Sequence, residues 1–125
     1  MNDRELLELA AKAAGIEIRW NDIASGYLHK VPAGSRPGLT GLVLWRPLLD
    51  DGDALRLAVL LSLRIEPYTG VRMGSSELSA VANITDVYSL HSTKVALSEL
   101  HGIDPDAATR RAIVRAAAEI GAAML

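Results

Sequence analysis

The chain has 125 residues, of which half are apolar and 22% are charged, with a net charge of −2 at neutral pH and no cysteine. This length is typical of one domain, and the apolar share excludes a disordered chain. The absence of cysteine excludes disulfides, thiolate catalysis and cysteine zinc sites, and the slightly acidic balance argues against binding of duplex nucleic acid. We expect a single domain over residues 1–125.

The start of the chain, MNDRELLELA, is charged and amphipathic and lacks the basic and apolar regions of a signal peptide. No apolar run approaches the ~20 residues that a membrane-spanning helix needs. We therefore expect a cytoplasmic protein with no membrane partner.

A first helix is predicted over residues 3–14. Asn2 and Glu5 form a variant of the capping box at its start, an apolar stripe follows, and Gly15 is a natural residue after a helix end. Apolar and charged residues then alternate over residues 16–20, which is the pattern of a half-buried strand.

Two more strands are predicted, at 26–31 and 41–45. The segment between them, VPAGSRPGLT over residues 31–40, carries two prolines and two glycines around Arg36. Such a composition is typical of irregular structure, so we expect an exposed loop there.

The stretch from residue 44 to residue 61, LWRPLLDDGDALRLAVLL, combines a strand end, a turn and a helix start. Pro47 stops the strand, Asp50 or Asp51 is expected as the N-cap, and Asp53 sits favourably in the positive first turn of the helix. The helix is apolar on nearly every side, so we expect it to be buried against a sheet.

The following segment is predicted to contain further strands. Residues 64–68 and 71–73 flank Thr69-Gly70, which is a plausible hairpin turn. Residues 78–100 hold one or two strands, and the part from 94 to 100 fits either a strand or one to two helical turns.

The end of the chain has clear helix signals, with Asp104 as N-cap, Pro105 at the first helical position and an alanine-rich run to about residue 123. The predicted order is α-β-β-β-α-β-β-α. It indicates an α+β fold, an αβα sandwich in which helices pack on a mostly antiparallel sheet.

Three blocks, NDRELLELAAKAAGIE, WRPLLDDGDALRLAV and DPDAATRRAIVRAAAEIG, resemble the signature blocks of the small bacteriophage α-β-α sandwich proteins and lie in the expected order. The resemblance implies a phage-encoded accessory protein that acts in an infected bacterial host. It implies no catalytic residues.

No pattern indicates catalysis or a metal site. His29, His91 and His101 lie in different segments without ligand spacing, and the acids at 50–53 begin like a calcium loop whose remainder is absent. The serines lack a nucleophile motif. We expect no catalytic residue, metal or cofactor, although paired carboxylates brought together by the fold stay open as an alternative.

The remaining signal is the segment from Ile23 to Leu49, which contains basic side chains and no acid. Guanidinium groups suit phosphate, and flat rings suit a base. We predict a site for an anionic nucleotide formed by Arg19, Tyr27, His29, Lys30, Arg36, Trp45 and Arg46. Arg36 and Arg46 would hold phosphate, and Tyr27 or Trp45 would stack. The alternative is that Trp20 and Trp45 are core residues and the basic side chains form a solvated face.

Three functions fit this interpretation. The first is counter-defence, in which a homo-oligomer binds and sequesters a nucleotide immune signal without altering it, and oligomerisation covers excess apolar helix surface. The second is inhibition of a host defence or replication protein through residues 74–102. The third is hydrolysis of a nucleotide signal.

Overall fold

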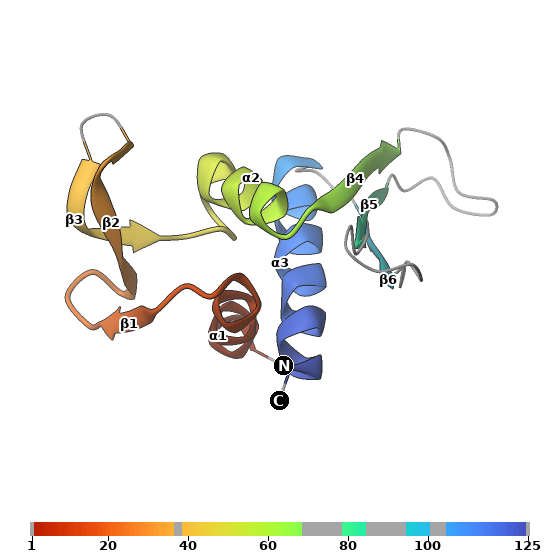
Figure 1. Cartoon of the computed structure of the whole chain (residues 1–125). Helices are drawn as coiled ribbons and strands as arrows, with labels where there is room; N and C mark the ends of the chain where they lie inside the picture. Colours follow the sequence, from red (N-terminus) through yellow and green to blue (C-terminus); the bar gives the residue numbers. More distant parts are fainter. Residues whose placement is uncertain (1, 37–38, 69–78, 85–94, 101–104, 125) are drawn as a thin grey trace.

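The computed structural model describes residues 2–36, 39–68, 79–84, 95–100 and 105–124. Its elements, in chain order, are α1 (Asp3–Ala14), β1 (Ile18–Asn21), β2 (Gly26–Arg36), β3 (Leu39–Trp45), α2 (Asp51–Leu60), β4 (Leu63–Tyr68), β5 (Ser79–Ile84), β6 (Val95–Leu100) and α3 (Pro105–Ala123). The strands form two antiparallel sheets, β1-β2-β3 and β4-β5-β6. The α+β class is confirmed, but the sequence pattern did not predict the division into two sheets, which lie on either side of the helices (Figure 1).

The first helix begins and ends where its local signals predict. The Asn2 side chain accepts a hydrogen bond from the Glu5 N–H at 2.9 Å, and the Glu5 carboxylate accepts one from the Asn2 N–H at 3.1 Å. Gly15 has a φ of 70°, and its N–H bonds to carbonyls of the last turn. Glycine adopts the left-handed backbone conformation at little energetic cost, so α1 ends at Gly15.

The β2–β3 hairpin is longer than predicted, and the expectation of a loop over residues 31–40 is wrong. β2 continues to Arg36, and β3 begins at Leu39. The register shifts between Val31 and Arg36, which marks an irregularity in the ladder. Proline cannot donate a ladder hydrogen bond but is accepted at such bulges, so Pro32 distorts the hairpin without ending it.

The core lies among the three helices and the end of β3. α1 and α2 both pack against α3, and α1 makes the larger contact (Figure 1). The contact between α1 and α3 is very close at Gly121, where an added Cβ would lie 2.0 Å from the Leu9 carbonyl oxygen. The buried residues of the core are Leu6, Ala10, Ala11, Trp45, Ala54, Leu57, Ala58, Ile113, Val114, Ala117 and Ala118.

The central helix, α2, begins as predicted but packs differently. Asp50 is its N-cap and accepts a hydrogen bond from the Asp53 N–H at 2.8 Å. The expectation that α2 is buried against a sheet is wrong, because it packs mainly on α3 and only slightly on β4. Leu55 and Val59 are 58% and 70% exposed. An apolar sequence alone does not specify which faces of a helix are covered.

The C-terminal half follows the prediction in its main elements. β4 confirms the first strand of the predicted hairpin, and residues 78–100 contain two strands, so the helical alternative for residues 94–100 is wrong. α3 begins at Pro105, runs to the predicted end, and packs on β5 and β6. The second predicted hairpin strand, at 71–73, and the predicted N-cap Asp104 lie outside the described residues.

Candidate functional site

A cavity of about 440 Å³ lies between the β2–β3 hairpin and α2. This volume falls within the ~300–1,000 Å³ of typical small-molecule sites. One part of its lining is apolar and comprises Ile16, Val31, Pro32, Trp45, Leu57 and Leu60. The other part is polar and comprises His29, Lys30, Ser35, Arg36, Asp53 and Arg56.

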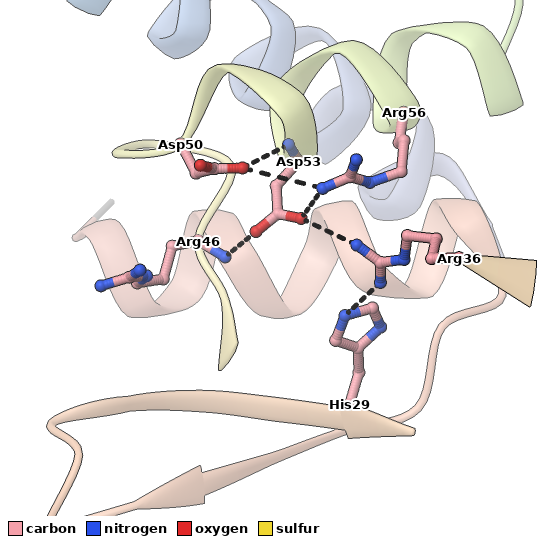
Figure 2. A network of polar contacts seen from close by, with 6 residues as sticks. All are labelled: His29, Arg36, Arg46, Asp50, Asp53 and Arg56. Atoms are coloured by element: carbon pink, nitrogen blue, oxygen red, sulfur yellow. Dashed lines mark hydrogen bonds and ion pairs between the residues drawn. The ribbon is translucent and has the colours of Figure 1, made fainter. Parts of the chain in front are cut away.

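Asp53 is the centre of the polar part. It is only 5% exposed. Its Oδ2 accepts a hydrogen bond from the Arg46 backbone N–H at 2.9 Å, and its Oδ1 accepts one from Arg56 Nη2 at 2.6 Å. Arg36 Nη1 lies 3.7 Å from the same Oδ1, so two guanidinium groups converge on one oxygen (Figure 2). Such pairing makes burial of the carboxylate possible.

The local sequence explains this convergence. Pro47 follows β3 closely, and the N-cap Asp50 starts α2 a few residues later, which places Asp53 in the first turn. Arg56 is one helical turn further along, within reach of Asp53. Arg36 is the last residue of β2 and reaches α2 from the hairpin, so the network joins elements that are distant in sequence.

His29 extends the network on the hairpin side. Its Nε2 lies 3.2 Å from Arg36 Nη2. Since a guanidinium can only donate, the imidazole nitrogen accepts this bond and the ring is neutral. Burial lowers the pKa of His29 below its ordinary value, and the positive charge of Arg36 lowers it further. His29 therefore adds no charge to the cavity at neutral pH.

The charges that face the cavity leave a small positive excess. Arg36 and Arg56 stand against Asp53, and their side chains are 18% and 51% exposed. Lys30 also borders the cavity, but it pairs across the sheet with Leu42 and is exposed. Because side chains alternate along a strand, Lys30 projects from the face opposite to that of His29 and adds charge only at the rim.

The structure brings together four of the seven residues that the sequence predicts for a ligand site. His29, Lys30, Arg36 and Trp45 line the cavity. Arg46 contributes only its backbone N–H, and its guanidinium points away from Asp53 (Figure 2). Trp45 is 3% exposed and belongs to the core, so it forms a wall and offers little free ring surface.

Tyr27 and Arg19 lie outside the cavity. Tyr27 is buried, donates a hydrogen bond to Glu8 and packs edge-on against Trp20 at 5.1 Å between ring centroids. The Arg4 guanidinium covers the Trp20 ring at 3.9 Å, so these side chains attach the first sheet to α1. Burial, and then the bond to Glu8, raise the pKa of Tyr27. Arg19 pairs with Leu28, which places it on the sheet face opposite to His29.

The sequence prediction missed two residues of the network. The sequence pattern predicts for Asp53 only a favourable position in the first turn of the helix, and it predicts no role for Arg56. A signal for Arg56 is present, because it is the only charged residue between Ala54 and Leu61. A lone cation on an otherwise apolar helix is expected to have a specific partner.

Within the described part of the chain, no group of three or more histidine and acidic side chains could hold a metal ion. No helix there has both the length and the apolar character to cross a bilayer. Comparisons with protein-family models, with curated proteins and with solved structures find no match. The resemblance to the phage sandwich proteins stays a prediction.

Proposed function

We propose that the protein is a non-catalytic binding module that holds a small organic anion, of the nucleotide class, in the cavity between the β2–β3 hairpin and α2. One observation carries the proposal: a cavity of about 440 Å³ with an apolar wall is lined by two guanidinium groups that converge on a single carboxylate. A small pocket with a few convergent polar groups is the usual form of a ligand site.

The two arginines have donors to spare for an anion. Each guanidinium carries five N–H groups. Arg36 directs one terminal nitrogen to Asp53 and the other to His29, and Arg56 directs Nη2 to Asp53 and Asp50. The remaining N–H groups are available to phosphate oxygens, and charge-assisted bonds of this type are strong.

The apolar wall suits the body of a nucleotide. Ile16 and Leu60 provide aliphatic surface beside the polar part of the cavity. Burying a flat base or a sugar edge against such surface stabilises the complex through the hydrophobic effect. The same cavity therefore offers an anion site and an apolar site for one ligand.

The polar groups favour binding over hydrolysis. The lone pair of His29 Nε2 already accepts from Arg36, and Asp53 accepts from Arg46 and Arg56. A general base needs an acceptor that can reach the proton it removes. The His29 Nε2 lone pair is occupied while the network is intact, and the Asp53 carboxylate is 5% exposed with three donors converging on it. In the setting implied by the phage resemblance, the protein would withdraw a nucleotide immune signal from its receptor.

The test is calorimetric titration of the purified chain with a panel of linear and cyclic nucleotides, followed by recovery of the ligand after heating. We expect at least one nucleotide to bind and to be recovered unchanged. Arg36→Gln should weaken its binding about tenfold, since a hydrogen bond to a charged group is lost. Arg19→Gln, on the opposite sheet face, is the matched control and should bind as the wild type does. Failure of every nucleotide to bind, or equal loss in both variants, would refute the proposal.

A further inference from the structure

We infer that the ligand carries a single phosphate group at the guanidinium pair, and that Asp53 is the residue that excludes longer phosphate chains. This inference rests on the proposed function and narrows it from nucleotides in general to nucleotides with one phosphate.

The first argument is the charge that faces the cavity. Arg36 and Arg56 bring two positive charges, and buried Asp53 brings one negative charge. Asp50, which is outside the cavity lining, also pairs with Arg56, and the neutral ring of His29 accepts from Arg36. A phosphate monoester carries about −1.5 to −2 at neutral pH. One such group more than balances the positive charge left on the two guanidinium groups, and exposed Lys30 at the rim offsets part of the remaining negative charge. A second phosphate would be left without a cation in the cavity.

The second argument is that the Asp53 carboxylate is held in place beside the two guanidinium groups. Asp53 is 5% exposed, and its carboxylate accepts a hydrogen bond from the Arg46 backbone N–H at 2.9 Å. The backbone N–H of Asp53 donates to the side chain of the N-cap Asp50. The carboxylate therefore stays beside any anion that the guanidinium groups bind. Asp53 is buried, and repulsion between like charges is stronger where water is excluded than in bulk water.

The third argument is the nature of the remaining wall. Away from the polar cluster the lining consists of aliphatic and aromatic side chains, among them Val31, Leu57 and Leu60. A charged group buried there without a partner would be strongly unfavourable. The wall accepts a base or a sugar edge but not a further phosphate.

The experiment is a calorimetric series on the wild-type chain with a nucleoside and its 5′-mono-, di- and triphosphate, repeated for the four common bases at constant ionic strength. We expect the monophosphate to bind most tightly, with both the nucleoside and the triphosphate at least about tenfold weaker. A triphosphate that binds as tightly as the monophosphate would overturn this inference and leave the proposed function standing. If no member of the series binds, the inference fails, whereas the proposed function fails only if the cyclic nucleotides do not bind either.

A variant isolates the role of Asp53. Asp53→Asn keeps the shape and an acceptor oxygen but removes the negative charge, so we expect the ratio of monophosphate to triphosphate affinity to fall towards one. Asp51→Asn lies in the same helical turn, outside the cavity, and should keep the wild-type ratio. Circular dichroism shows whether Asp53→Asn is folded. An unchanged ratio of monophosphate to triphosphate affinity in the folded variant would refute the role assigned to Asp53. The wild-type series tests the charge limit even if this variant does not fold.

Discussion

Gly121→Ala is expected to destabilise the protein by forcing α1 and α3 apart. The added Cβ would lie 2.0 Å from the carbonyl oxygen of Leu9 and 2.8 Å from its carbonyl carbon, both of which are backbone atoms. Ordinary contacts of a Cβ begin at 3.4 Å, so the two helices must separate by more than 1 Å. No rotamer change can relieve such a clash, because neither atom belongs to a side chain.

The magnitude follows from two opposing effects. Overpacking of a close contact costs about 1–3 kcal/mol and more where backbone must move. Replacing glycine by alanine inside a helix gains up to about 1 kcal/mol. We expect a net loss of about 2 kcal/mol in the free energy of unfolding, which corresponds to a fall of roughly 6–10 °C in Tm for a domain of this size.

Chemical denaturation and thermal melting followed by circular dichroism measure this change. Gly52→Ala is the matched control, since Gly52 also lies in a helix but its Cβ would meet flexible side-chain atoms of Arg56 and Asp50 at 3.1 and 3.2 Å. This control should stay within about 1 kcal/mol of the wild type. Equal stability of Gly121→Ala and the wild type would contradict the close contact between Gly121 of α3 and the Leu9 backbone of α1.

Three further predictions concern the network and the caps. Arg46→Gln should leave nucleotide affinity unchanged, because only its backbone N–H bonds Asp53; a loss as large as that of Arg36→Gln would contradict this. The lowered pKa of His29 means that the unfolded chain binds a proton more readily, so its contribution to stability is present above about pH 6.5 and is lost as the pH falls towards the folded pKa. Chemical denaturation at several pH values should show that the free energy of unfolding falls less on acidification in His29→Gln than in the wild type. Identical pH profiles of the two proteins would refute this prediction. Asn2→Ala should cost about 1 kcal/mol in the same assay through loss of the N-cap, whereas no change would deny the capping box a stabilising role.

The helices could be predicted well from the sequence because their signals are local. Asn2, Gly15, Asp50 and Pro105 mark helix ends through hydrogen bonds and backbone preferences that involve only near neighbours. The predicted boundaries of α1 are therefore confirmed, and the N-cap of α2 is one of the two residues predicted, Asp50 or Asp51. None of these signals depends on which other element packs nearby.

The strand arrangement could not be read in the same way, because pairing joins distant residues. Pro32 and the glycines around it gave a strong loop signal, yet cross-strand bonds on both sides of the bulge maintain β2 and β3 through this segment. Periodicity likewise shows that a segment is a strand but not which sheet it joins. The two separate sheets thus became visible only in three dimensions.

The candidate site could be predicted only in part, because the strand register decides which side chains face it. The basic residues of the early strands included His29 and Arg36, which face α2, and equally Arg19, which pairs with Leu28 on the other sheet face. Composition records which residues occur together but not the faces to which they belong. Arg56 was missed because it lies in another element altogether.

The position of Asp53 links the fold to the proposed binding. Removing its charge would leave Arg36 and Arg56 near each other without the negative charge on which they converge, so the carboxylate stabilises this arrangement of the two arginines. The same negative charge would repel the additional negative charges of a longer phosphate chain. Under the proposed function, a site assembled in this way would accept an anion but limit how much negative charge it carries, and selectivity would follow from the residue that holds the two arginines together.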